Sequence, residues 1–278
     1  MTAGGGQRGN IGKGRAMKIL LVGDIVGGPG RRIFREVVRK LRGEHAVQAV
    51  VVNGENAAAG NGITRALAEE LFAAGADVIT LGDHVWGQKD LEPTISGEKR
   101  LLRPLNFPAG TPGQGSVTVQ STIGSFTVVN LLGRVFMNPM DCPFRAMDAL
   151  LAALPRNIPV IVDFHAEATS EKIAMGHFLD GRVAAVFGTH THVQTSDARI
   201  LPKGTAYITD IGMTGPAHSV IGREIAPVLK RFTTGIPAKF EIAKGPGVLE
   251  GAVIDIDRQS GKALSIAPYR YREDDVRA

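Results

Sequence analysis

Cysteine is almost absent from this chain of 278 residues, since Cys142 is the only one. An intrachain disulfide is therefore excluded, and we expect a reducing compartment, the cytoplasm. The sequence also lacks any run of eighteen apolar residues, so we predict no membrane span. Cys142 has no metal-ligand spacing around it, and we interpret it as a packing residue.

Acidic side chains are absent from the first sixteen residues. The net charge of the chain is +5, and Arg8, Lys13 and Arg15 contribute three of these charges, which leaves +2 for residues 17–278. The segment is rich in glycine and has no hydrophobic stretch of signal-peptide length. We therefore predict a disordered basic extension over residues 1–16 and a single domain over residues 17–278. A weak phosphate-binding arm is the alternative for the extension, and the near-neutral domain predicts no stable nucleic-acid partner.

The usual glycine-rich nucleotide-binding motifs are missing beside the first apolar strand. The glycines that follow Asp24 do not form Gly-x-Gly-x-x-Gly, and the chain contains no Gly-Lys-Ser or Gly-Lys-Thr. A dinucleotide-binding site and a P-loop are therefore disfavoured.

Short apolar runs alternate with amphipathic helices in the first third of the chain. Pro29 suits a first helical turn, and Ile33, Val37 and Leu41 recur at helical spacing. This alternation predicts an α/β fold with a largely parallel sheet. The predicted strands cover residues 18–22, 47–52 and 77–81, and the predicted helices cover residues 29–43 and 65–74.

The rest of the chain contains more strands and fewer helices, which predicts an antiparallel or mixed sheet. We expect the two sheets to pack face to face with helices outside, because this arrangement buries the apolar side chains of both sheets. The predicted elements are a hairpin of residues 116–120 and 125–131, a helix over 144–154, and strands over 159–164, 183–187, 206–211, 239–243, 249–257 and 263–269.

Metal-ligand and acid/base residues follow the apolar strands at the point where each ends. In α/β sheets, ligands gather at the carboxyl ends of the strands, because successive loops converge there. In an extended backbone, residues i and i+2 point to the same side, so His190 and His192 would aim at one point. The residues are Asp24, Glu55, Asn56, Asp83, His84, His165, His190 and His192.

Each of these residues also has a purely structural interpretation. Asp24 could cap the helix that follows it, and a lone histidine such as His165 is more often structural than functional. It would be a rare coincidence for five separate strand ends all to carry residues of the metal-ligand type. Together these residues therefore predict a metal site. His45, His177 and His218 lack such placement, and we interpret them as structural.

The same series of motifs resembles a known enzyme family. Gly23-Asp24, Gly54-Glu55-Asn56, Gly82-Asp83-His84, His165 and Gly188-Thr189-His190-Thr191-His192 are similar to the motif series of calcineurin-like metallophosphoesterases. The segments 53–56, 103–108, 163–172 and 209–216 resemble the YmdB-like family of bacterial phosphodiesterases. The resemblance covers nearly the whole chain from Met17 to the early 270s.

This resemblance implies a four-layer αββα sandwich that hydrolyses cyclic nucleotides, notably 2′,3′-cyclic ones, with two divalent metal ions. Iron is the expected metal, with manganese or zinc possible, because mixed carboxylate, amide and imidazole ligands suit these ions better than calcium. A homo-oligomer is also plausible by resemblance. The first ion would be held by Asp24, Glu55, Asn56 and His192, and the second by Glu55, Asp83, His165 and His190.

His84 is the predicted general acid, because the leaving alkoxide of a phosphodiester needs a proton. The chain departs from the wider family at two places beside it. Asp83 stands where that family has asparagine, and Gly87 stands where an acidic residue commonly orients the acid histidine. Asp90 or a backbone carbonyl could replace this orienting group. Trp86 could stack on a base or pack internally.

Three functional interpretations stay open from the sequence. The first is a phosphodiesterase acting on a small nucleotide, and the second is a phosphomonoesterase that uses the same ions. The third is a cyclic-nucleotide-binding or nucleic-acid-binding regulator with little catalysis, which Asp83 and Gly87 favour. Arg134 could contact phosphate or lie on the surface.

Overall fold

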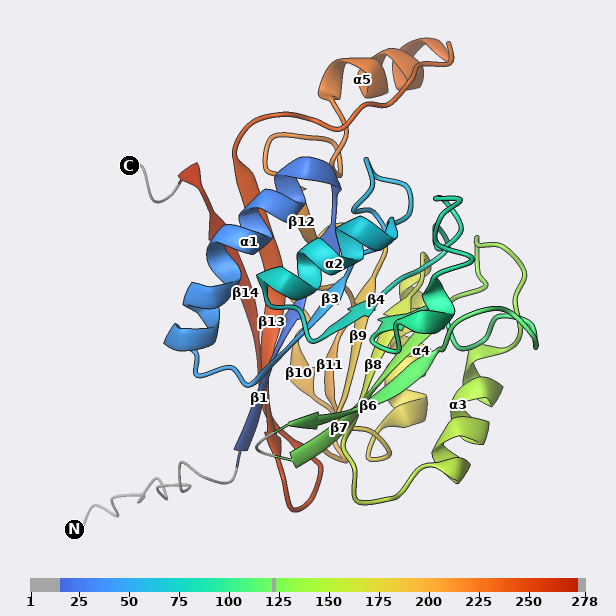
Figure 1. The fold of residues 1–278 in the computed structure, drawn as a ribbon, viewed down its shortest axis with the longest axis vertical. Helices are drawn as coiled ribbons and strands as arrows, with labels where there is room; N and C mark the ends of the chain where they lie inside the picture. Colours follow the sequence, from blue (N-terminus) through green and yellow to red (C-terminus); the bar gives the residue numbers. More distant parts are fainter. Residues whose placement is uncertain (1–15, 122–123, 275–278) are drawn as a thin grey trace, which may run out of the picture.

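The computed structural model describes residues 16–121 and 124–274, in which the strands form two sheets (Figure 1). The eight-stranded sheet has the order β2-β12-β13-β1-β3-β4-β5, and β14 also pairs with β13. Strands β1, β3, β4 and β5 run parallel, whereas β13 is antiparallel to β1. Its strands are β1 (Ala16–Val22), β2 (Asp24–Ile25), β3 (Ala49–Asn53), β4 (Val78–Thr80), β5 (Leu101–Leu102), β12 (Met213–Pro216), β13 (Gly247–Asp257) and β14 (Ala263–Arg272).

The six-stranded sheet has the order β10-β11-β9-β8-β7-β6. Its four central strands are parallel and its two edge strands are antiparallel, which confirms the mixed sheet expected for this half. The strands are β6 (Ser116–Ser121), β7 (Gly124–Leu132), β8 (Val160–His165), β9 (Ala185–Thr189), β10 (Arg199–Ile200) and β11 (Ala206–Ile208).

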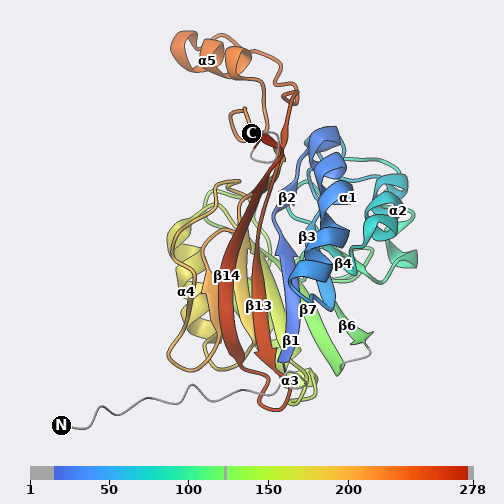
Figure 2. The ribbon, with the colours of Figure 1, turned by 90° about the vertical axis from the view of Figure 1, so that its left-hand side faces the viewer.

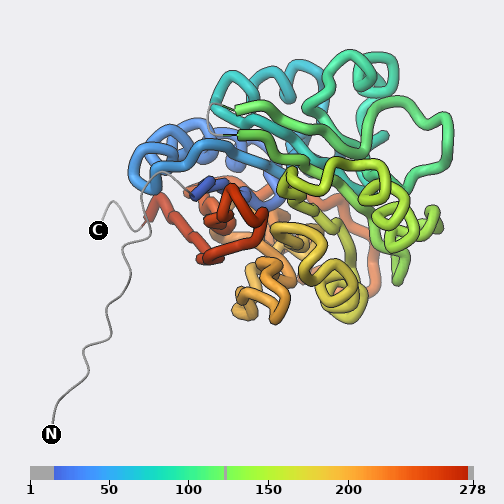
Figure 3. The backbone as a smooth tube through the Cα atoms, turned by 90° about the horizontal axis from the view of Figure 1, so that it is seen from below, coloured from blue at the N-terminus to red at the C-terminus, as the bar shows by residue number. Residues whose placement is uncertain are grey.

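Helices cover the outer faces of both sheets (Figures 2 and 3). Helices α1 (Gly27–Glu44) and α2 (Arg65–Ala74) lie on the eight-stranded sheet, and α3 (Pro143–Ala153) and α4 (Thr169–Leu179) on the other. Three hydrophobic clusters fill the three spaces between these four layers. The expected four-layer α/β sandwich is therefore confirmed.

Strand β1 shows how the sequence pattern builds these layers. Ile19 and Leu21 pack into the cluster between the sheets, whereas Leu20 and Val22 pack into the cluster beneath the helices. Successive side chains of a strand point to opposite faces, so a wholly apolar strand supplies both clusters. Each fully buried side chain of this size stabilises the fold by about 1.5–3 kcal/mol.

Most of the predicted elements are confirmed, one predicted strand is absent, and two helices were missed. Residues 239–243 form no strand and contribute only an isolated bridge between Ile242 and Arg223. Helix α4 and helix α5 (Ile225–Thr234) were not predicted. Since α5 buries only Val228, it lacks the core-facing stripe that makes a helix visible in sequence, and it projects from the top of the sandwich.

The basic extension falls outside the described residues, apart from Ala16, with which β1 begins. Among the described helices, none combines the length and the apolar character that crossing a bilayer would require.

Candidate metal centre

The parallel strands of both sheets end at one place, and the eight predicted side chains meet there. Asp24 follows β1 after a single glycine, and Glu55 and Asn56 follow β3. Asp83 and His84 follow β4, while His165 is the last residue of β8. His190 and His192 follow β9. Their shared position confirms that the strand ends converge. The roles of these residues in metal binding and catalysis stay predictions.

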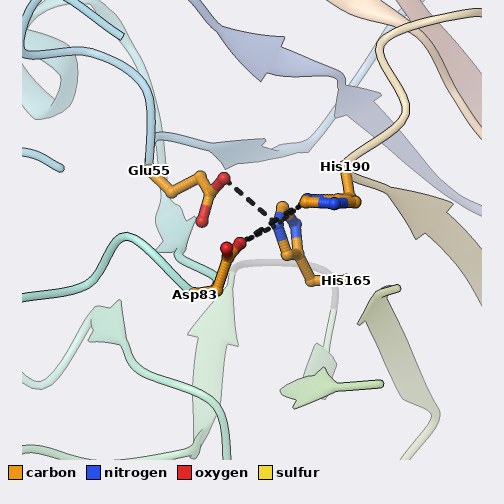
Figure 4. A group of neighbouring side chains, drawn as sticks. All are labelled: Glu55, Asp83, His165 and His190. Carbon is orange, nitrogen blue, oxygen red and sulfur yellow. Dashed lines mark hydrogen bonds and ion pairs between the residues drawn. The ribbon is translucent and has the colours of Figure 1, made fainter. Parts of the chain in front are cut away.

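Four of these side chains form a tight cluster (Figure 4). The ligand atoms of Glu55, Asp83, His165 and His190 all lie within 4.8 Å of one another. Nε2 of His165 is 3.1 Å from Glu55 Oε1, 3.2 Å from Asp83 Oδ1 and 3.0 Å from His190 Nδ1. Gly82 makes room for them, because a Cβ at that position would collide with the Glu55 carboxylate and the His165 ring. This cluster is the set that the resemblance implies for the second ion.

Asp24, Asn56 and His192 form a second group beside the first. Asp24 Oδ1 is 3.7 Å from His192 Nε2, and Asn56 Nδ2 is 3.2 Å from the same nitrogen. Asn56 Nδ2 also donates to Glu55 Oε1 at 3.1 Å. The Glu55 carboxylate therefore touches both groups, as expected of a ligand shared by two ions.

The backbone at His190 and His192 is not the extended strand that the sequence reasoning assumed. Strand β9 ends at Thr189, and the two histidines have φ values of 94° and 63°. Positive φ is uncommon outside glycine and costs about 1–2 kcal/mol per residue. The strand-parity argument was therefore wrong, because left-handed turns, and not alternation along a strand, bring the two imidazoles to the site.

A buried polar chain anchors the other nitrogen of His165. Thr189 Oγ1 lies 2.8 Å from His165 Nδ1 and donates to Asp163 Oδ1 at 2.7 Å. Since the hydroxyl proton is used on Asp163, the oxygen accepts from Nδ1–H, so in the neutral ring that binds a metal the Nε2 lone pair would face the cluster. Burial raises the pKa of Asp163 to about 6.

The two loop histidines are anchored in the same way by groups that the sequence reasoning missed. Glu167 Oε2 is 3.1 Å from His190 Nε2, and the backbone oxygen of Ile221 is 3.0 Å from His192 Nδ1. Each contact leaves the opposite ring nitrogen facing the ligand groups. The segment 163–172 contains Glu167, but nothing in the local sequence indicates the Ile221 carbonyl.

A buried ion pair holds the loop between the two histidines. Lys172 Nζ lies 2.7 Å from Asp210 Oδ2, and the two side chains are 2% and 0% exposed. The same carboxylate oxygen accepts from the backbone N–H of Thr191 at 3.2 Å and from its hydroxyl at 2.7 Å. Because breaking a buried pair leaves an uncompensated charge, this contact fixes the loop firmly.

The electrostatics of the site fit divalent cations. Burial raises the pKa of Asp24, and its Oδ1 has no hydrogen-bond partner among the described residues. Burial also opposes ionisation of Glu55, but the imidazoles of His165 and His84 outweigh it and hold that pKa well below its usual value. Burial disfavours the charged His165 ring, yet the surrounding carboxylates raise its pKa well above the ordinary one. Three converging carboxylates with an unpartnered oxygen and mixed imidazole ligands suit metal ions of the iron, manganese or zinc type.

His84 differs from the ligand residues because its side chain is 39% exposed. Its Nδ1 is 3.2 Å from Asn56 Oδ1 and 3.3 Å from Glu55 Oε1, and the hydrogen bond to Glu55 raises its pKa. Asp90 instead accepts from the backbone N–H of Arg65. Glu55 and Asn56 therefore contact His84 where the sequence suggested Asp90 or a backbone carbonyl.

A pocket of about 290 Å³ opens above the ligand groups. This volume lies near the lower end of the usual range for small-molecule sites. Arg134 does not line it and donates to Cys142 Sγ, while Trp86 packs edge-on against Phe107 with ring centroids 6.4 Å apart. The lining residues are Glu55, Asn56, His84, Glu167, His190, Thr191, His192, Ile221 and Arg223.

The three histidines interpreted as structural lie outside this lining. His45 packs edge-on against Tyr269 with ring centroids 5.3 Å apart, and His218 pairs with Asp274 at 3.2 Å. His177 lies in the last turn of α4.

Comparison with solved structures shows two close matches over the whole fold. A hypothetical protein from Thermus thermophilus is 43% identical with a TM-score of 0.87, and covers 92% of this chain and 100% of its own. A structure described as a novel phosphatase from Mycoplasma pneumoniae is 36% identical with a TM-score of 0.88, over 92% and 94% of the two chains. A Haemophilus influenzae NAD nucleotidase, 12% identical with a TM-score of 0.53 over 92% of this chain and 56% of its own, shares the fold alone.

Sequence comparison identifies the family. The 2′,3′-cyclic-nucleotide 2′-phosphodiesterase of Bacillus subtilis (strain 168) is 48% identical over 93% of this chain and 98% of its own length. The family described as YmdB-like protein matches residues 20–269. The chain therefore belongs to the YmdB-like family.

Proposed function

We propose that this protein is a metal-dependent phosphodiesterase that opens 2′,3′-cyclic nucleotides. The observation that carries the proposal is the convergence of two ligand groups on the shared, fully buried carboxylate of Glu55 at the floor of a pocket. The 48% identical relative, which is named for this activity, supports the choice of substrate.

Seven side chains would hold two divalent ions. Asp24, Glu55, Asn56 and His192 would hold one ion, and Glu55, Asp83, His165 and His190 would hold the other. Iron is the favoured metal, with manganese or zinc as substitutes. When bound, such a pair of ions supplies a water of lowered pKa and neutralises charge on the phosphoryl group.

Other residues of the chain would supply the proton for the leaving group and orient the metal ligands. His84 lies at the pocket wall, where it can donate a proton to the departing ribose oxygen. Its contact with Glu55 favours the protonated ring, which a general acid requires at the start of the reaction. Thr189, Glu167 and the Ile221 carbonyl hold the ligand histidines in the tautomers that face the ions.

Purified protein reconstituted with iron or manganese tests the proposal. We expect about two ions per chain and conversion of 2′,3′-cyclic AMP to a single phosphomonoester that is not degraded further. Protein that holds two ions and leaves 2′,3′-cyclic AMP intact would contradict the proposal and favour the binding regulator.

A phosphomonoesterase is the second candidate, favoured by the 36% identical structure described as a phosphatase. Release of inorganic phosphate distinguishes the two functions, because only a monoesterase would liberate it from adenosine 3′-monophosphate.

A further inference from the structure

A tight turn at residues 220–223 joins the pocket wall to the His192 ligand. Val220 and Arg223 exchange two backbone hydrogen bonds of 2.9 Å, and the two residues between them have φ values of 45° at Ile221 and 97° at Gly222. Positive φ is a genuine outlier for a β-branched residue such as isoleucine. Such strain persists where surrounding structure holds it, and here the Ile221 carbonyl contacts His192 Nδ1.

The guanidinium group of Arg223 is held by the loop that follows Glu55 and Asn56. Its Nη2 donates to Gly60 O at 2.7 Å, and its Nη1 donates to Ala59 O and to Phe240 O, each at 3.3 Å. The guanidinium lies directly on Gly60, since a Cβ there would come within 2.6 Å of Nη2. The absence of a side chain at Gly60 therefore allows this close approach.

Three of the five N–H groups of Arg223 are used in these contacts. The Nε–H and one Nη2–H remain. The atoms Nε and Nη2 share one edge of the planar group, and this edge can bind phosphate or carboxylate oxygens in a fork. Within residues 16–121 and 124–274, the partners of the Arg223 guanidinium are backbone carbonyls and no carboxylate pairs with it, so its charge is not neutralised locally.

The charge of Arg223 contrasts with the rest of the pocket. Among the described residues that line the pocket, it is the one with permanent positive charge, and the wall around it includes Glu55 and Glu167. A phosphodiester is an anion, and those carboxylates would repel it wherever metal ions do not offset them.

We propose that Arg223 binds the phosphoryl group of the substrate through Nε–H and the remaining Nη2–H. This inference rests on the proposed phosphodiesterase function and adds a substrate-anchoring residue to it. Arg223 is preorganised by three carbonyls, so little side-chain entropy is lost when the anion binds.

Arg103 provides a matched control for this proposal. It too donates to three backbone carbonyls, those of Pro104, Thr111 and Pro112, and within the described part of the chain it has no carboxylate partner. Burial lowers the pKa of both arginines. Because Arg103 does not line the pocket, Arg103→Gln removes a similar set of structural contacts without removing the pocket cation.

The test compares Arg223→Gln with Arg103→Gln in metal-loaded protein. We expect Arg223→Gln to raise KM for 2′,3′-cyclic AMP about 10- to 100-fold, the loss of a charge-assisted fork, with kcat changed less than about threefold and metal content unchanged. Arg223→Lys should recover part of the loss, because it restores the charge without the fork. Arg103→Gln should leave KM and kcat at wild-type values.

A binding measurement keeps the inference separate from catalysis. Calorimetric affinity for adenosine 3′-monophosphate should fall by the same factor in Arg223→Gln and stay unchanged in Arg103→Gln. An unchanged KM and affinity in Arg223→Gln, or a loss of metal in that variant, would overturn the inference, the latter because the residue would then only support the His192 turn. If wild-type protein binds this nucleotide through Arg223 and hydrolyses no phosphodiester, the proposed function fails while the anchoring residue stands.

Discussion

The side chains at the floor of the pocket are more deeply buried than those at its rim. At the floor, Asp24, Glu55 and His165 are fully buried, and Glu55 and His165 each contact several neighbouring side chains. At the rim, the side chains of His84 and Glu167 are 39% and 48% exposed. Buried, densely bonded groups keep one geometry, whereas half-exposed groups can meet a ligand from solution. The difference supports the proposed division, with metal holding at the floor and substrate chemistry at the rim.

Removing a floor ligand should have the largest effect. We expect His192→Ala or Asp24→Ala to lose bound metal and to reduce turnover about 10⁴-fold or more, because the bound ions would supply the nucleophile in the proposed function. Metal analysis and kinetics on the same preparations measure both losses. His45→Ala, which removes a histidine outside the pocket, should change neither. Full metal content in His192→Ala would break the division between floor and rim.

Removing the rim acid should separate chemistry from metal binding. His84→Ala is expected to lower kcat about 10²- to 10⁴-fold, the range of general acid catalysis, while the protein keeps its ions. A substrate with a good leaving group, such as an aryl phosphodiester, should lose less, since it needs no proton. His218→Ala serves as the control on the exposed surface. Metal loss in His84→Ala would move this residue from the rim to the floor.

Asp163, which accepts a hydrogen bond from the Thr189 hydroxyl beside His165, should make the free energy of unfolding depend on pH. Burial raises the pKa of Asp163 from 3.8 to about 6, so the folded protein binds this proton more tightly than the unfolded chain does. The contribution of Asp163 to stability is therefore greatest below pH 4 and falls as the pH rises from about 4 to 6, by roughly 3 kcal/mol. Urea unfolding of metal-free protein measures this decline, and Asp163→Asn should reduce it, while the raised pKa of Asp24 leaves a remainder.

Asp197 provides the control for that measurement. Hydrogen bonds from Thr209 and Thr195 outweigh the burial of Asp197 and lower its pKa, which gives the opposite pH dependence. Asp197→Asn should therefore keep the decline between pH 4 and 6. A decline of equal size in Asp163→Asn would show that another group causes it.

Glu167 lies at the rim and contacts the ligand residue His190, and its substitution should have the smallest effect of these variants. Because its carboxylate contacts His190, a proposed ligand of one ion, we expect Glu167→Gln to weaken binding of that ion about 10- to 100-fold. Stepwise metal titration should show one weakened site and one unchanged site. Equal weakening of both sites would mean that Glu167 acts through the charge of the whole pocket.

Much of the fold and most of the site could be predicted from local patterns. Apolar runs of five or six residues predicted β3, β8 and β9, and the ligand residues lie at or just after the ends of these strands. The prediction worked because a buried parallel strand needs continuous apolar side chains, and its carboxyl end must face the site. It missed α5, which lies mostly in solvent and carries little of the core signal.

The sequence by itself determined most of the strands, three of the four helices that cover them and the kinds of ligand at the strand ends, since these depend on short-range alternation and residue chemistry. Only the tertiary structure decided the left-handed turns at His190 and His192, the anchoring of His165 by Thr189, and the place of Arg223 in the pocket. These features depend on contacts between segments far apart in the chain, such as Arg223 with Gly60 and Ile221 with His192. Every residue carries a chemically equivalent backbone carbonyl, so the sequence does not show which one will accept a hydrogen bond from a given histidine or arginine. Only the folded structure decides this.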